Sequence, residues 1–186
     1  MKGIFKKAPS LPRYCVTWDP ARVLSYMDSL PRNSELLLEN LTKKLCTLLA
    51  ILSGSRCQTI VSLDLDHCHL NENQTQLSFY ISKVLKNTKP GHHQAPLEFL
   101  GFPGNEKWCP IHCFLEYTKR TRLIRENSNP GVMKGLLILR HSHPFTPVTA
   151  ASTIGRYVKS FLQEMQAWTL TPSPRTRHDT RQRAQL

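Results

Sequence analysis

Apolar residues recur at helical spacing along much of the chain, separated by short polar breaks. Residues 17–30 predict the first such helix. Asp19 is a suitable N-cap, and Pro20 suits the first position of a helix. The polar segment at residues 31–33 ends it. The inward face of this predicted helix consists of Val23, Leu24, Met27 and Leu30.

A longer apolar stripe predicts a second helix from about Ser34 and Glu35 to about Ser53, with Gly54 as its C-terminal cap. Lys43 and Lys44 should point away from the core on the opposite face. The predicted buried stripe consists of Leu38, Leu41, Leu45, Leu48, Leu49 and Leu52. After Arg56, residues 58–63 predict a short helical turn.

The pattern then changes to short segments typical of strands. Residues 65–70 and 75–82 predict two strands around the polar turn 71–74, and residues 95–99 predict a third strand. Between the second and third strands, residues 83–94 form a cation-rich stretch with a Pro-Gly turn, which predicts a loop.

Helical spacing returns in residues 111–124 and 151–165, on either side of a short apolar run and loop at 135–148. These elements predict a mainly α fold with a small three-stranded antiparallel sheet, which is an α+β class. In the last helix Arg156 and Lys159 should point outward. Its predicted inward residues are Ile154, Tyr157, Val158, Phe161, Leu162 and Met165.

The chain length suits one domain with tails. We expect a basic, proline-containing arm at residues 1–15, the domain at 16–165, and a basic disordered tail at 166–186. That tail has two prolines, four arginines and no clear hydrophobic period.

The composition is strongly basic, with 25 Lys and Arg residues against 13 Asp and Glu residues and a formal net charge of +12. This charge indicates attraction to a polyanion, with nucleic acid first and an acidic membrane second, although a merely soluble basic protein is the alternative. No stretch is long and apolar enough for a secretory signal or a membrane span. We therefore expect reduced cysteines and a nuclear, or otherwise cytoplasmic, protein that is not secreted.

Six cysteines raise the question of a metal site. Cys68, Cys109 and Cys113 lie near histidines, but the spacing of Cys109 and Cys113 around a proline suits one helix face better than a zinc knuckle. We expect these cysteines to act as small buried hydrophobic residues, and we expect no metal or cofactor.

The order of segments resembles the catalytic domain of the tyrosine recombinases, the phage-integrase family. Residues 53–60 (SGSRCQTI) resemble the family's first-arginine segment, and residues 81–99 (ISKVLKNTKPGHHQAPLEF) resemble its lysine turn within the sheet. Residues 41–65, 114–121 and 152–165 fit the same pattern. The resemblance covers about residues 16–165 and is closest to the recombinases of DIRS-type retrotransposons, which implies an incomplete integrase-like catalytic domain.

The resemblance implies roles for two side chains. Such enzymes break DNA by attack of a tyrosine on a phosphate, and a planar guanidinium such as that of Arg56 can donate two parallel hydrogen bonds to the phosphate oxygens. The alternative is an ordinary arginine that pairs with Asp64 or Asp66. Lys89, with Lys86 as the second choice, would be the general acid, or else a solvated loop lysine that only binds phosphate.

Further DNA contacts are expected from the basic and histidine side chains around these positions. Because related enzymes act as oligomers on DNA, a homo-oligomer on DNA is a further expectation for this chain, and no membrane partner is expected. The expected DNA-contacting residues are Lys43, Lys44, Arg56, Lys86, Lys89, His92 and His93.

Other parts of the family pattern are not found at the expected places. Tyr157, the last tyrosine, belongs to a predicted apolar helix face, so we expect a core residue rather than a nucleophile. One in-frame match to the His-x-x-Arg segment exists, His178 to Arg181, within the basic tail. A shifted reading frame over Pro172 to Asp179 can instead encode Phe-Thr-Ala-His-Ser-Thr-Arg, which also resembles this segment. A genuine alternative terminus, for example from splicing, is the other explanation.

The sequence therefore predicts a DNA-binding, recombinase-like protein of a mobile element, associated with recombination and integration but inactive in strand cleavage as written. The alternative is a non-enzymatic helical module of the same origin that binds a protein partner through the leucine stripe in residues 36–52.

Overall fold

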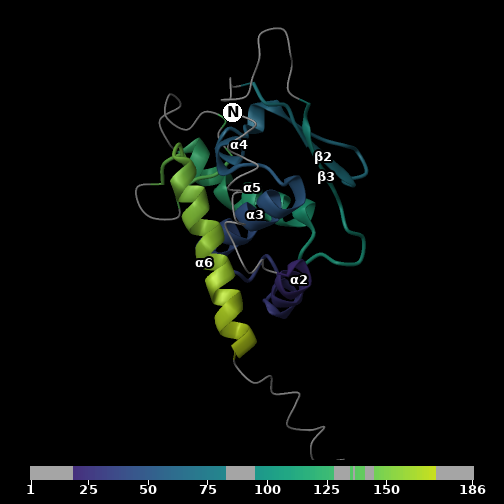
Figure 1. Ribbon diagram of the computed structural model, residues 1–186. Coiled ribbons are helices and arrows are strands. Elements are labelled where there is room, and N and C mark those ends of the chain that lie inside the picture. Colours follow the sequence, from purple (N-terminus) through teal and green to yellow (C-terminus); the bar gives the residue numbers. More distant parts are fainter. Residues whose placement is uncertain (1–18, 83–94, 128–134, 136, 141–144, 171–186) are drawn as a thin grey trace, which may run out of the picture.

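The structure is a computed structural model that describes residues 19–82, 95–127, 135, 137–140 and 145–170. Over these residues the fold is mainly helical with one small antiparallel sheet, so the predicted α+β class is confirmed. Figure 1 shows α6 along one side of the molecule and the sheet on the other, with α3 between them. The elements in chain order are α2 (Pro20–Ser29), α3 (Leu38–Ser53), α4 (Cys57–Val61), η1 (Leu65–His67), β1 (Cys68–Leu70), β2 (Gln76–Phe79), β3 (Leu97–Leu100), α5 (Pro110–Glu126) and α6 (Ala151–Leu170).

Helix α2 begins as its sequence predicts. The Asp19 carboxylate accepts a hydrogen bond from the Ala21 amide at 2.9 Å, and Pro20 occupies the first turn. Val23 and Met27 are fully buried. The predicted cap is confirmed, and so is the inward face at Val23 and Met27, whereas Leu24 and Leu30 are only half-buried.

Helix α3 is the centre of the core. It packs against α5, α6, α4 and β3, and Leu41, Leu45 and Leu49 are fully buried. Burying a leucine side chain contributes about 1.5–3 kcal/mol relative to leaving it exposed. Because most of the leucine stripe is core, it is not available to a protein partner. The prediction that Leu52 is buried is wrong, because this residue lies in the last turn of α3 and is 39% exposed.

The start of α3 also differs from the prediction. The Arg32 carbonyl accepts hydrogen bonds from the amides of Glu35 and Leu36, at 2.9 and 3.2 Å, so residues 32–36 form a separate turn. Leu37 is then extended, with a ψ of 146°, and the helix begins at Leu38 rather than near Ser34. The ψ of Leu37 lies outside the helical region, so the hydrogen bonds of this turn do not continue into α3.

The sheet has the order β1-β2-β3, with both pairs antiparallel. Phe79 of β2 lies opposite Leu97, and its ring packs edge-to-face on Phe99 and Phe114 at centroid distances of 6.1 and 5.8 Å. All three predicted strands are present. The first is shorter than predicted, because the Asp64 carboxylate caps the 3-10 turn η1 through the Asp66 amide.

Helix α6 continues through Leu170, so the predicted disordered tail is wrong for residues 166–170. Phe161 and Met165 are buried, and Trp168 continues their spacing on the same face. The Trp168 ring lies 5.7 Å from the ring of Tyr26 on α2, a contact that the sequence pattern alone does not reveal. Residues 171–186, like the predicted arm at 1–15, lie outside the described residues.

None of the helices in the described part of the chain combines the length and the apolar character that crossing a membrane requires.

Candidate nucleic-acid interface

The backbone of Arg56 is held between two helices. Gly54 ends α3 with the left-handed φ of 59° that favours glycine, and the Ser55 amide donates to the Ser53 hydroxyl at 3.1 Å. Arg56 is the N-cap residue of α4, and its carbonyl accepts a hydrogen bond from the Thr59 amide at 2.8 Å. The predicted glycine cap is confirmed, and it places Arg56 on a defined turn rather than on a long loop.

The side chain of Arg56 is exposed. Within the described residues, no hydrogen bond or ion pair involves its guanidinium, so the alternative pairing with Asp64 or Asp66 does not occur there. Asp64 instead caps the Asp66 amide, and its charge acts on Arg125. Burial lowers the pKa of Arg125, whereas Tyr117 and Asp64 oppose that shift.

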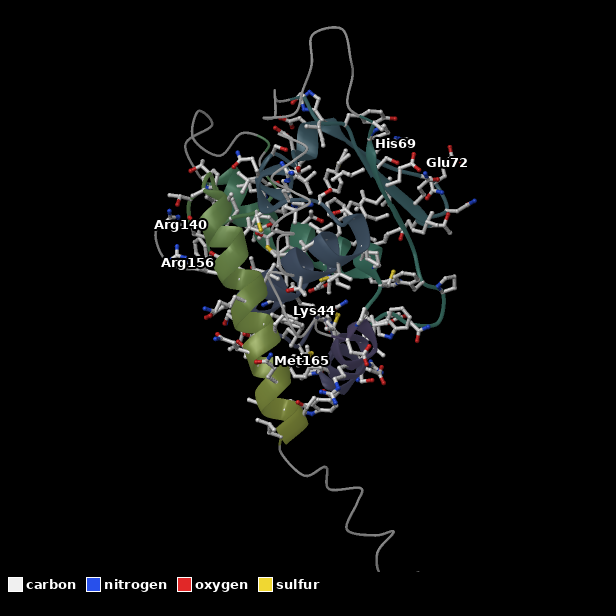
Figure 2. All side chains as sticks on the ribbon, in the orientation of Figure 1. Lys44, His69, Glu72, Arg140, Arg156 and Met165 are labelled. Carbon is white, nitrogen blue, oxygen red and sulfur yellow. The ribbon has the colours of Figure 1, made fainter. Side chains whose placement is uncertain are left out.

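Two further arginines lie near this end of the fold. Helix α4 packs against α6, and a Cβ atom at Gly155 would lie 3.9 Å from the Cys57 sulfur, so the residue after Arg56 lies close to the residue before Arg156. Figure 2 shows Arg140 and Arg156 on the same side of the molecule, toward the start of α6. Both are exposed. Sequence reasoning predicted that Arg156 points outward but included neither residue in the site.

Local hydrogen bonds hold the backbone of Arg140 and the side chain of Arg156. The Leu139 amide donates to the hydroxyl of the buried Tyr117 at 2.9 Å, and the Arg140 amide donates to the Thr146 carbonyl at 2.7 Å. The Arg156 guanidinium donates to the Thr153 hydroxyl at 3.3 Å. Arg140 does not belong to a helix, so no helical spacing predicts where it lies. Its position follows from the antiparallel bridge between Leu139 and Pro147, shortly before α6 begins.

Lys43 and Lys44 depart from the predicted DNA-contacting set. The Lys43 ammonium lies 2.8 Å from the Glu39 carboxylate and 3.1 Å from that of Glu164, and its side chain is only 12% exposed. Burial lowers the pKa of Lys43, but the hydrogen bonds to the two glutamates outweigh this effect and raise it. The expectation that Lys43 points freely into solvent is therefore wrong.

Lys44 is the larger correction, because it is fully buried. Helix α3 is covered by α6 on one side and α5 on another, so the face opposite the leucine stripe is also inside the protein. The Lys44 ammonium donates to the Asn33 side-chain oxygen at 2.8 Å, and burial lowers its pKa. In this arrangement Lys44 cannot contact DNA.

Several predicted site residues lie outside the described residues: Lys86, Lys89, His92, His93, His178 and Arg181. Their roles remain predictions. Tyr157 is only 8% exposed, so the interpretation of this tyrosine as a core residue is confirmed.

Cys109 and Cys113 are placed as the sequence predicts, on one helix and buried, whereas Cys68 is only half-buried and lies in β1. Cys109 and Cys113 are buried at the start of α5, where the Cys113 amide donates to the Cys109 carbonyl at 3.1 Å. Burial raises the pKa of the Cys113 thiol to about 12. Among the described residues, no three His, Cys, Asp or Glu side chains converge in a way that could hold a metal ion.

The comparisons with protein-family models, with curated proteins and with solved structures give no match.

Proposed function

We propose that this chain is a DNA-binding, tyrosine-recombinase-like protein of a mobile element. Its main support is the exposed Arg56 guanidinium, which has no protein partner among the described residues and is held by the junction of α3 and α4. A guanidinium in such a setting is able to donate two parallel hydrogen bonds to one phosphate group. Arg140 and Arg156 would extend the contact along the DNA backbone.

The chain's charge supports the same partner. A formal net charge of +12 attracts DNA over a distance, and phosphate contacts of this kind release counterions from the duplex. We assign no strand-cleaving role to Tyr157, because its ring is buried. In this proposal Lys89 belongs to the same DNA surface as Arg56, either as the general acid or as a phosphate contact.

Arg56→Ala tests the proposal by fluorescence anisotropy with a labelled short duplex at several salt concentrations. We expect affinity to fall by about tenfold, in line with the loss of hydrogen bonds to a charged group. Arg122→Ala is the matched control, because Arg122 is an exposed arginine that pairs with Glu126 on α5. We expect it to change the affinity less than threefold, the smaller effect of removing one charge far from the contact.

Binding of the unaltered chain should weaken steeply as salt increases, in proportion to the number of phosphates contacted. Equal losses in the two variants would reduce the interaction to general charge attraction and contradict a specific role for Arg56. Binding that does not respond to salt would contradict the phosphate-contact proposal altogether.

A further inference from the structure

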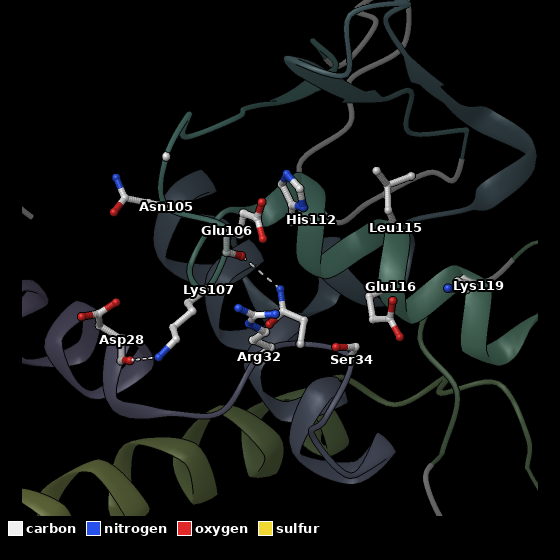
Figure 3. Close-up of a pocket in the computed structure, with 12 residues that line it drawn as sticks. Asp28, Arg32, Ser34, Asn105, Glu106, Lys107, His112, Leu115, Glu116 and Lys119 are labelled. Atoms are coloured by element: carbon white, nitrogen blue, oxygen red, sulfur yellow. Dashed lines mark hydrogen bonds between the residues drawn. The ribbon is translucent and has the colours of Figure 1, made fainter.

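A second site lies at the other end of α3. A cavity of about 620 Å³ opens between the turn that follows α2, the loop before α5 and the first turns of α5. Figure 3 shows the side chains that surround it. Its volume lies within the range of about 300–1,000 Å³ that is typical of small-molecule sites.

Two hydrogen bonds hold the walls of this cavity together. The Lys107 ammonium donates to the Asp28 carbonyl at 2.6 Å, and the Asn33 side-chain amide donates to the Glu106 carbonyl at 3.1 Å. Figure 3 draws both bonds across the region between α2 and the loop before α5. The cavity is therefore bounded by segments that are cross-linked to each other.

The buried Lys44 ammonium lies behind one wall. Asn33, which lines the cavity, accepts its hydrogen bond at 2.8 Å, and no described carboxylate lies within ion-pair distance of Lys44. A buried ammonium without a negative partner is costly. The Asp28 carboxylate of the cavity lining acts on Lys44 from beyond ion-pair distance, and an anionic group in the adjacent cavity would add to that negative charge.

The lining itself carries charges of both signs. Its cationic side chains are Arg32, Lys107 and Lys119, and its acidic side chains are Asp28, Glu106 and Glu116. None of these six forms an ion pair with another described residue. Equal numbers of cations and carboxylates disfavour a polyanion such as DNA, whose phosphates the carboxylates would repel.

We propose that this cavity binds a small zwitterion, a molecule that carries one phosphate or carboxylate group and one amine. The anionic group lies beside Arg32 and Ser34, on the side of Asn33 and the buried Lys44 ammonium. The amine lies within reach of the Glu106 and Glu116 carboxylates. Because α3 has 16 residues and is about 24 Å long, this site is well separated from Arg56 beyond its other end.

The test is an NMR titration of the isotope-labelled full chain. The probes are phosphoethanolamine and β-alanine, which carry both charges, together with inorganic phosphate and ethanolamine, which each carry one. We expect saturable shifts of the backbone amides of Asn33, Glu106 and His112 with at least one zwitterion. Inorganic phosphate and ethanolamine should bind about tenfold more weakly, because each forms only half of the charged contacts.

Arg32→Ala is compared with the unaltered chain. Arg32 contributes its backbone carbonyl to the turn at residues 32–36, so removing its side chain should leave that turn in place. We expect it to weaken zwitterion binding by about fivefold or more. Arg22→Ala, an exposed arginine of α2 outside the cavity, should change binding less than twofold.

Four results would overturn the proposal. The first is the absence of saturable shifts up to about 10 mM probe, a concentration well above a millimolar dissociation constant. The second and third are binding of inorganic phosphate as tightly as the zwitterion, and binding of the zwitterion by Arg32→Ala as tightly as by the unaltered chain. The fourth is displacement of the zwitterion by a short DNA duplex. Loss of DNA binding in Arg56→Ala would not affect this result, so the two proposals fail independently.

Discussion

Two cations on or just after the same helix have opposite environments. Lys44, in the second turn of α3, is fully buried and has one described hydrogen-bond partner, the side-chain oxygen of Asn33. Arg56, just beyond the end of α3, is exposed, and in the described part of the chain its guanidinium has no hydrogen bond or ion pair. Both belong to the set predicted to contact DNA, yet only Arg56 is available to an external phosphate.

The difference shows how much the neighbouring elements decide. Lys44 lies on a helix that is covered from several sides, so its ammonium exchanges water for one amide oxygen. Arg56 lies at a turn where α3 ends and α4 begins, so its side chain leaves the core at once. A polar position in an amphipathic stripe is a surface position only when nothing packs against that face.

Of the variants that test this comparison, Asn33→Ala is expected to change the free energy of unfolding most. The variant removes the described acceptor of the Lys44 ammonium and leaves a buried charge without a partner. We expect a loss of about 2 kcal/mol in the free energy of unfolding. Chemical denaturation measures this loss, with Asn105→Ala as the control, because Asn105 is exposed and its hydrogen bonds are made by its backbone.

The same substitution in a Lys44→Met background should cost much less, because no buried ammonium remains to lose its partner. An equal cost in both backgrounds would assign the effect to the bond between Asn33 and the Glu106 carbonyl instead.

A smaller effect is expected from Lys44→Met alone. Replacing the buried ammonium by an apolar side chain of similar length should raise the free energy of unfolding by about 1.5 kcal/mol at neutral pH. Burial lowers the pKa of Lys44 from its ordinary value of 10.5, so below the lowered pKa the charge destabilises the fold in full. As pH rises through that pKa toward 10.5, the folded state loses the proton first and the advantage of the variant shrinks.

Denaturation curves at neutral and alkaline pH measure this difference. A variant that is less stable than the unaltered chain at neutral pH would mean that the Lys44 ammonium stabilises the fold, and would contradict the prediction that burying this charge is costly.

The smallest effect is expected from Gly54→Ala at the other end of α3. An added Cβ meets no atom within 4 Å, so the cost comes from the left-handed φ of 59° alone. We expect a loss of about 1 kcal/mol in the free energy of unfolding. Gly104→Ala is a matched control, since Gly104 also has a positive φ, of 81°, and open space around it.

The two glycine variants should differ in DNA affinity rather than in stability. Gly54→Ala disturbs the turn that leads to Arg56 and should weaken DNA binding, whereas Gly104→Ala, which changes a residue lining the cavity at the other end of α3, should not. Anisotropy measurements on both variants make this comparison, and equal affinities would separate the Gly54 turn from the DNA contact.

The sequence was most informative where structure is local. Asp19 and Pro20 marked the start of α2, Gly54 marked the end of α3, and short segments bounded by polar turns or loops marked the strands. The position of Arg56 followed from the same glycine cap. The cavity was not predicted, because its lining comes from residues 28–34 and 104–119, two regions that are far apart in the chain and carry no shared motif.

By itself, the sequence determined most of the helical stripes, the caps at Asp19 and Gly54, and the three strands, because each depends on neighbouring residues and on backbone preference. Only the tertiary structure decided that Lys44 is buried, that Leu52 is exposed and that α6 continues to Leu170. Those outcomes depend on which elements pack on each face, such as Tyr26 of α2 against Trp168. Helical spacing specifies which residues share a face, but only packing determines which faces are covered.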